Sequence, residues 1–220
     1  MGWPSLLVLV RHAESEGNLR TAEERATFDR ATHNYALTER GREQARLTGE
    51  FIRNTYADFD AYYVSYYRRS HETMKIMYPD AKIYEDPRLA EAQRGIWHMM
   101  TNEQVKMRFP EEIERKEREG LYHYRPFGGE NWPDVELRIH SFLGTLNRDQ
   151  HQKRVFMVVH GHWLLLFQRL IHHFSIDESV KRYKDGIAEN ASVTVYHTMG
   201  RPNAPLLHMI EHLVPWEGKI

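Results

Sequence analysis

The chain has 220 residues, which is enough for one sizeable hydrophobic core and short for two independent domains. Hydrophobic residues make up 41% and charged residues 28%, which excludes the disordered and membrane-spanning classes. Lys and Arg number 30 against 31 Asp and Glu, so no global field draws the protein to nucleic acid or to an anionic membrane. A local cluster of cations must therefore hold any anion that it binds.

The absence of cysteine excludes disulfides, thiolate nucleophiles and zinc–thiolate sites, and it fits a cytoplasmic setting. The apolar run Leu6 to Val10 is too short for a secretory signal, and no basic segment precedes it. No stretch approaches the roughly 18 apolar residues that span a bilayer. We therefore expect a soluble, cytoplasmic protein without a membrane anchor.

In the first third of the chain, apolar runs alternate with helical patterns. Residues 5–10 are apolar and branched, which predicts a strand buried on both faces. Residues 13–37 are polar and aperiodic, which indicates a long loop with helical pieces. A helix is predicted to start at Thr38 as its N-cap. A second strand is expected at 61–65, followed by a helix over 68–78 that ends before a proline.

The rest of the chain continues this alternation. A third short strand is expected at 82–84, and residues 95–130 are polar, aromatic and partly helical, as in an insertion over one end of the sheet. A helix over 133–147 begins with proline in its first turn. Residues 155–159 form the clearest buried strand, and an apolar helix over 163–173 follows it.

Two closing strands, at 192–197 and 206–212, are expected to be joined by a turn at 200–203. Alternating strands and helices predict an α/β fold: a mostly parallel open sheet with helices on both faces, in three layers (αβα). No internal repeat or linker interrupts the pattern. We therefore expect a single domain over 1–220, with a lid-like insertion at about 95–130.

Polar side chains follow the predicted strands at the point where each strand ends. The first strand runs into Arg11 and His12, the second leads to Arg69, and the strand over 155–159 runs into His160. Glu91 lies in the segment after the third strand. Because ligands of open α/β sheets bind beyond the carboxyl ends of the strands, these groups should converge. Arginine forks match phosphate oxygens, and a neutral histidine is a nucleophile near pH 7. The pattern predicts a phosphoryl site.

Each of these residues alone has a simpler explanation. A lone histidine such as His12 is more often structural than catalytic, and His160 could cap a tight strand-to-helix turn. Arg69 alone would be a solvated helix residue, and Glu91 a salt-bridged surface carboxylate. Only their joint occurrence, in this order along the chain, favours a catalytic site.

The motifs around these residues resemble those of the histidine phosphatase superfamily, also called the phosphoglycerate mutase-like family. The likeness runs from residue 6 to about residue 197. The matching segments are Arg11–Asn18 (RHGES..N), Leu37–Ala45 (LT..G..QA), Ser65–Thr73 (SPL.RA..T), Leu89–Thr101 (L.E...G.WEG.T), Gly128–Arg138 (GGES..DV..R) and Val158–Gly161 (V.HG). The chain departs from these patterns at Ala13, Tyr66, His98 and Asn131, which concerns the substrate more than the reaction.

The resemblance implies a phosphoryl transfer through a phosphohistidine. His12 would be the nucleophile, and Glu91 would give a proton to the leaving oxygen and take one from the attacking water. The residues that would surround the phosphoryl oxygens are Arg11, Asn18, Arg69, His160 and the backbone N–H of Gly161. Like charge and desolvation beside a phosphate should raise the pKa of Glu91.

The resemblance implies neither a metal nor another cofactor, because arginines neutralise the phosphoryl charge. A rival metal site would use His160 and His162 with the pair at 172–173. On one helix, that pair lies too far along the axis to share an ion with His162. The expected partner is a small phosphorylated metabolite and not nucleic acid or membrane.

Two further alternatives stay open within the family. One is a phosphoglycerate mutase, and the other is an inactive relative that binds phosphorylated ligands. The sequence after Glu91, Ala-Gln-Arg-Gly-Ile-Trp-His, is more typical of the phosphatases. Substrate choice should lie in residues 95–130 and the loop after Asn18, and the pattern leaves the oligomeric state open. Candidates for binding further acidic groups are Arg20, Arg88, Arg94, Tyr122, His123, Tyr124 and Arg125.

Overall fold

The computed structural model describes residues 2–201 and 204–220, so the predicted turn at 200–203 lies partly outside the described residues. A six-stranded sheet in the order β3-β2-β4-β1-β5-β6 forms the centre of this part of the chain. Its strands are β1 (Leu6–Arg11), β2 (Ala61–Val64), β3 (Ile83–Glu85), β4 (Arg154–Val159), β5 (Val193–Arg201) and β6 (Ala204–Leu213).

The sheet is mostly parallel, as predicted. β1 and β2 both pair with β4 in parallel, and β3 pairs with β2 in the same sense. β5 and β6 form an antiparallel extension on the other side of β1, which confirms the two closing strands. β4 therefore stands between β1 and β2, although both of these strands precede it in the chain.

Helices surround the sheet and occupy the long connections. They are α1 (Glu16–Leu19), α2 (Ala22–Thr27), α3 (Glu39–Tyr56), α4 (Arg68–Met77), α5 (Asn102–Arg108), α6 (Pro110–His123), α7 (Trp132–Asp149), α8 (Gly161–His172) and α9 (Ile176–Asp185). Short 3-10 turns lie at Thr32–Asn34, Pro87–Leu89 and Gly95–His98. No helix was predicted over the residues of α9. None of the helices in the described ranges is long and apolar enough to cross a membrane.

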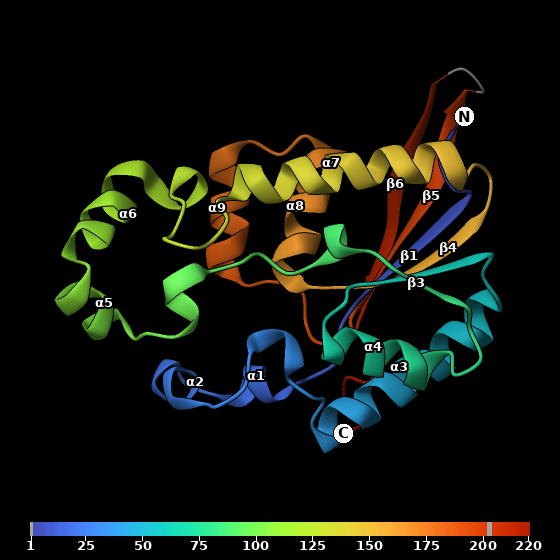
Figure 1. The fold of residues 1–220 in the computed structure, drawn as a ribbon. Coiled ribbons are helices and arrows are strands. Elements are labelled where there is room, and N and C mark those ends of the chain that lie inside the picture. Colours follow the sequence, from blue (N-terminus) through green and yellow to red (C-terminus); the bar gives the residue numbers. More distant parts are fainter. Residues whose placement is uncertain (1, 202–203) are drawn as a thin grey trace.

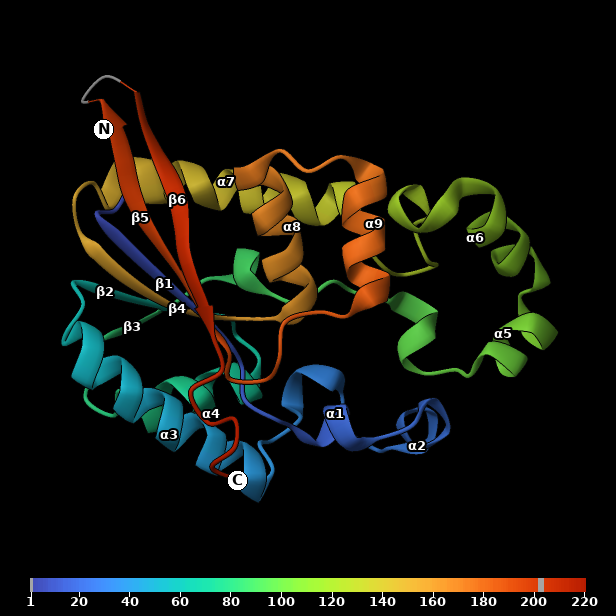
Figure 2. The same ribbon diagram turned by 180° about the vertical axis from the view of Figure 1, so that it is seen from behind.

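Each face of the sheet packs against its own pair of helices, which gives the predicted three layers (Figures 1 and 2). On one face, Leu7 and Leu9 of β1 join a core with residues of α7 and α8, such as Phe142. On the other face, Val8 joins a core with residues of α3 and α4, such as Met74. Strands buried on both faces need apolar residues at every position, which explains the unbroken runs in the sequence.

The segment at about 95–130 contains α5 and α6. In both ribbon views these helices project beyond the three layers, on the side where α9 and α2 lie. α6 contacts both α7 and α9, and the turn over Gly95–His98 contacts α2. The segment is thus held at its base by elements from three other parts of the chain.

Candidate active site

The strand order brings the ends of β2, β4 and β1 next to one another. Because these strands are parallel neighbours, the residues that follow them, Ser65, His160 and His12, lie at one edge of the sheet. The chain order and the spatial order of the strands differ here, which is where open α/β sheets place their ligands. Arg69 reaches the same edge from the first turn of α4.

The side chain of Arg69 joins the two imidazoles. Its Nε donates to Nε2 of His12 at 3.1 Å, and its Nη2 donates to Nδ1 of His160 at 3.2 Å. The remaining Nη1 donates to the carbonyl of Thr32 at 2.9 Å. The two imidazole centroids are 5.1 Å apart. One guanidinium therefore fixes the orientation of both rings.

These hydrogen bonds also fix the tautomers. Nδ1 of His12 lies 2.8 Å from the carbonyl oxygen of Ala13, which only accepts, so this nitrogen carries the proton and Nε2 keeps its lone pair. In His160, Nδ1 accepts from Arg69, so Nε2 carries the proton and donates to Oγ of Ser65 at 2.8 Å. Nε2 of His12 thus carries no proton, and its lone pair accepts from Arg69.

Burial and the nearby arginines keep both rings neutral. Burial, then the positive charges of Arg69 and Arg11, hold the pKa of His12 well below its usual range. Burial and the charge of Arg69 do the same for the pKa of His160. A neutral imidazole with an available lone pair is the form that can attack phosphorus.

Arg69 is buried and Arg11 is partly buried, and neither cation has a carboxylate within 4 Å in the part of the chain that the structure describes. Burial lowers the pKa of Arg69 to about 10 and lowers that of Arg11 as well. Arg11 donates to the carbonyl of Ala188, but its Nε is buried with no partner among the described residues. Because a buried charge is costly unless it is paired, this arrangement suits a bound anion.

The start of α8 lies close to Arg11 and Ile187, so a side chain at position 161 would displace these neighbours. A Cβ on Gly161 would lie 2.6 Å from the side chain of Ile187 and 3.2 Å from Nε of Arg11. Gly161 therefore lets the amino end of α8 and the guanidinium stand side by side.

The carboxylate of Glu91 caps the same helix end. Its Oε1 accepts from the amides of Ala92 at 3.0 Å and Trp163 at 3.2 Å. Its Oε2 accepts from the amide of His162 at 3.3 Å. Glu91 is thus held at the first turn of α8 by His162 and Trp163, which directly follow His160 and Gly161 in the chain.

In the phosphate-free protein the pKa of Glu91 lies below its usual value, and the predicted rise beside a bound phosphate stays a prediction. Burial raises the pKa, but His162, the amide of Ala92, Arg69 and Arg94 lower it, and the balance lies below the usual value. The sequence did not indicate that the amides at the start of α8 would stabilise the negative charge of Glu91. A bound phosphoryl group would add the opposing negative charge.

A family model of the histidine phosphatase superfamily (branch 1) matches residues 7–208. The chain belongs to this superfamily. The predicted family and fold are therefore confirmed.

Its relatives carry the names of phosphatases and of mutases. Phosphoserine phosphatase 1 of Hydrogenobacter thermophilus is 28% identical over 212 residues, which cover 94% of this chain and 93% of that protein. Phosphoglycerate mutase-like protein AT74 of Arabidopsis thaliana is 33% identical over 165 residues, 69% of this chain and 49% of that protein. The chain thus spans about half the length of AT74.

The fold is also that of solved phosphatases. The alpha-ribazole phosphatase from Shigella flexneri superposes with a TM-score of 0.72 at 21% identity, over 93% of this chain and 95% of that one. At this identity the likeness shows the shared fold.

Asn18, the remaining residue that the superfamily pattern predicts at the phosphoryl group, lies at the exposed rim of the site. Its side-chain oxygen accepts from the amide and the hydroxyl of Ser15, both at 2.9 Å. The side chain of Asn190 lies 3.5 Å from the same oxygen and donates to the carbonyl of His12 at 2.9 Å. Asn190 therefore links this rim to the backbone of the histidine.

Of the four departures from the superfamily pattern, two have a clear structural role. The amide of Ala13 donates to Thr73 at 3.0 Å, which ties the loop after β1 to α4. Asn131 caps α7 by accepting from the amide of Asp134. Tyr66 is exposed, and His98 accepts from the amide of Arg94 at 3.0 Å. The backbone carbonyl of Ala13 also accepts from Nδ1 of His12. The side chains of Tyr66, His98 and Asn131 make no hydrogen bond to His12, Arg69 or His160 in the described residues.

From the sequence, no role was predicted for Ser65, and His162 was considered only as a ligand of the rival metal site. Ser65 directly follows β2 and accepts a hydrogen bond from Nε2 of His160. This contact could not be predicted from the sequence, because it depends on β4 lying next to β2. His162 is buried between the rings of Trp132 and Tyr183, with centroids 4.8 and 4.9 Å away. Burial lowers its pKa to about 4. Within the described ranges, no group of three or more His, Cys, Asp or Glu is placed to hold a metal ion.

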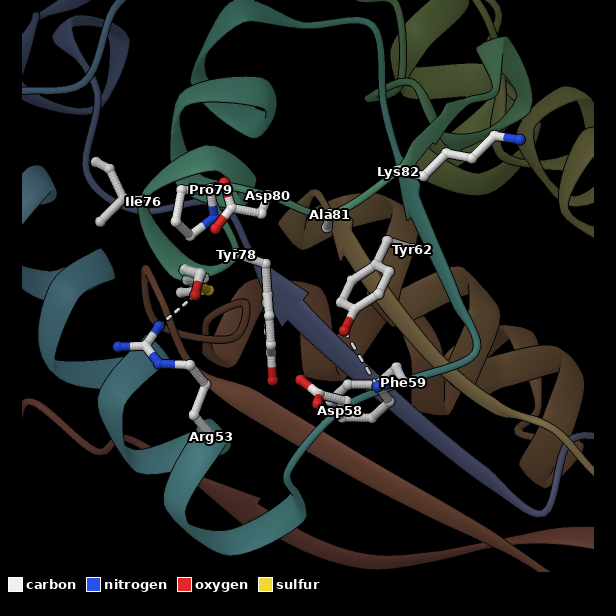
Figure 3. A pocket seen from close by; sticks show the side chains of 11 residues that line it. Arg53, Asp58, Phe59, Tyr62, Ile76, Tyr78, Pro79, Asp80, Ala81 and Lys82 are labelled. Atoms are coloured by element: carbon white, nitrogen blue, oxygen red, sulfur yellow. Dashed lines mark hydrogen bonds between the residues drawn. The ribbon is translucent and has the colours of Figure 1, made fainter.

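A separate hollow of about 620 Å³ lies at the other end of α4 (Figure 3). The rings of Tyr62 and Tyr78 stand close together in it, with centroids 4.9 Å apart, and the hydroxyl of Tyr62 accepts from the amide of Phe59. Tyr62 lies near the amino end of β2, whereas the site residues follow the carboxyl ends. None of the predicted site residues lines this hollow.

Proposed function

We propose that the protein hydrolyses small phosphomonoesters through a phosphohistidine on His12. The observation that carries the proposal is the pair of guanidinium groups of Arg11, which is partly buried, and Arg69, which is buried. Both lack a carboxylate partner among the described residues, and Arg69 donates to the unprotonated Nε2 of His12. A loose phosphoryl transition state needs fixed positive charge around its oxygens, and such a pair supplies it.

The proposed reaction has two steps. Nε2 of His12 attacks phosphorus, the ester P–O bond breaks, and the protonated carboxyl of Glu91 gives its proton to the leaving oxygen. Water then attacks the phosphohistidine, the P–N bond breaks, and the Glu91 carboxylate takes the proton from water. Inorganic phosphate leaves, and the steps draw on no cofactor.

The test is labelling and turnover with matched variants of the nucleophile. We expect the wild-type protein to hydrolyse 4-nitrophenyl phosphate and to trap an acid-labile, base-stable phosphoryl group. His12→Ala and His12→Asn should lose both, because neither side chain offers an imidazole lone pair. Retention of turnover in both variants, or a label that is stable in acid, would refute the proposal.

The alternative of a phosphoglycerate mutase is favoured by the mutase-like name of AT74, and the residues after Glu91 weigh against it. Isomerisation of 3-phosphoglycerate, with and without 2,3-bisphosphoglycerate, separates the two reactions. A hydrolase releases inorganic phosphate under both conditions. An inactive relative would bind phosphorylated ligands and show neither reaction.

A further inference from the structure

A second hollow, of about 260 Å³, opens beside Glu91. It is lined by Ala92 and Gln93, which follow Glu91, and by His162, which follows Gly161. If Glu91 protonates the leaving oxygen, the rest of the substrate must extend from His12 past Glu91 into this cleft. The inference below rests on the proposed function in this respect.

Aromatic side chains form the walls of this cleft. Trp132 and Tyr183 meet edge to face, with centroids 5.4 Å apart. The 95–130 segment contributes Trp97 and Tyr124 to the lining, and Nε1 of Trp97 donates to the hydroxyl of Tyr124 at 3.0 Å. These contacts fix the rings, so the cleft offers flat apolar surfaces that need no rearrangement to pack against a ring.

The cleft also has an excess of positive charge. Arg25, Arg94 and Lys116 line it, and none of them has a carboxylate within 4 Å in the described ranges. Glu130 also lines the cleft, but its Oε1 is paired with Nε of Arg138 at 2.9 Å. Other arginines of the same segment, by contrast, are ion-paired. They are Arg115, which pairs with Glu112, and Arg125, which pairs with Asp134.

The cations lie against the aromatic walls, and Lys116 lies over the ring of Trp97. Nζ of Lys116 lies 4.3 Å from the centre of the Trp97 ring. Arg94 donates to the hydroxyl of Tyr183 at 3.4 Å. Arg25, from α2, donates to backbone carbonyls of the preceding loop. A ligand that lies between the rings would therefore meet positive charge at its far end.

We propose that the leaving group of the substrate combines a ring-sized apolar body with a second acidic group, a carboxylate or a phosphate. The ring packs between Trp97 and Trp132, and the acidic group binds Lys116 and Arg25. The volume lies below the roughly 300–1,000 Å³ of ordinary ligand sites, which favours a small metabolite over a phosphoprotein.

The experiment compares three esters: 4-carboxyphenyl phosphate, phenyl phosphate and 3-phosphoglycerate. The first has a ring and an acid, the second a ring alone, and the third an acid alone. We expect kcat/KM for the first to exceed that for each of the others by roughly ten- to hundredfold, the range of one charged hydrogen bond. A ratio near one against phenyl phosphate overturns the acidic group, and a ratio near one against 3-phosphoglycerate overturns the ring.

The variants Lys116→Gln and Arg25→Gln test which side chains supply the preference. Each should reduce the ratio of carboxyphenyl to phenyl ester, and the double variant should bring it close to one. Arg94 is left in place because its charge also acts on Glu91. Lys106→Gln is the matched control: it removes one exposed charge from α5 outside the cleft, and it should leave the ratio unchanged.

Equilibrium binding of the same esters to His12→Asn separates this inference from the proposed function. If the wild-type protein hydrolyses no ester, the proposed function fails, yet the cleft should still bind the carboxyphenyl ester more tightly. Equal affinity for carboxyphenyl and phenyl phosphate would overturn the inference, even where hydrolysis is intact.

Discussion

Arg69 illustrates how one side chain can organise a site. Its guanidinium has five N–H donors and no acceptor, so every group that faces it must accept. This requirement sets the proton positions of His12 and His160 and leaves the nucleophilic lone pair on the same side as the positive charge. Lysine could not replace it, because a single ammonium lacks the planar fork that reaches two rings at once.

The acid–base role of Glu91 predicts a pH effect on turnover. The acid must be protonated to act, so kcat should fall as pH rises through the pKa that Glu91 has in the substrate complex. That pKa starts low in the free protein, and the charge of the bound phosphoryl group raises it. The Glu91→Gln variant should lose about 10²- to 10⁴-fold in kcat and should also lose this alkaline limb. An identical limb in both proteins would remove Glu91 from the role.

Sequence motifs indicated the acidic, basic and nucleophilic side chains but not their mutual orientation. Arg69 and His12 are 57 residues apart, and the geometry of their contact depends on β1 and α4 meeting at one edge. The partners of Glu91 are backbone amides, which every residue has, so no side-chain pattern could mark them. This is why its pKa direction could not be predicted.

At the scale of elements, the start of α3 supports the loop that carries His12, the proposed nucleophile. Thr38 caps this helix, as predicted, and accepts from the amide of Gly41 at 2.9 Å. A Cβ on Gly41 would lie 1.9 Å from the carbonyl oxygen of Glu14, two residues after His12. The helix can therefore pack against the catalytic loop only with glycine at this position.

Gly41→Ala should thus affect stability and activity together. Overpacking against backbone costs about 3 kcal/mol in the free energy of unfolding. Displacement of the loop should also lower kcat more than tenfold, since misplaced catalytic groups lose their alignment. Urea unfolding and steady-state assays measure the two effects.

Gly144→Ala is the control for that change. Gly144 lies within α7, and a Cβ there meets nothing within 4 Å. Alanine should stabilise the protein by about 0.5–1 kcal/mol without a change in kcat. Equal effects of the two substitutions would contradict the packing argument.

The strands and most helices could be predicted because their apolar runs and caps are local signals. α9 was missed although Ser175 caps it and Ile176, Val180 and Tyr183 recur on one face. Its remaining residues are polar and charged, so the apolar positions were too few to show a period. For the 95–130 segment, the sequence predicted partial helix but not the bounds of α5 and α6. The position of this segment depends on contacts with α7 and α9.

For the whole molecule, buried neutral histidines make stability depend on pH. Burial lowers the pKa of His162 and of His98 to about 4, and those of His12 and His160 lie well below the usual value. In the unfolded chain these four imidazoles bind protons near pH 6.5, whereas in the folded protein His162 and His98 bind them only near pH 4. His12 and His160 also resist protonation in the folded protein. Stability is therefore complete above pH 6.5 and declines as pH falls toward 4.

The expected loss is about 3 kcal/mol for His162 alone over that whole interval. Urea unfolding at pH 7, 6 and 5, in buffer without phosphate, measures the decline. The lowered carboxyl pKa values act mainly below this window. His162→Gln should show a shallower slope, and a stability that does not change between pH 7 and 5 would refute the account.

The position of β4 between β1 and β2 also bears on synthesis of the protein. Those two strands pair with β4 and not with each other, so a chain growing on the ribosome cannot join them until residue 159 has emerged, out of 220. The same late strand delivers His160. A premature stop after residue 69 and before β4 would yield a fragment that contains His12 and Arg69 but lacks the strand that joins β1 to β2.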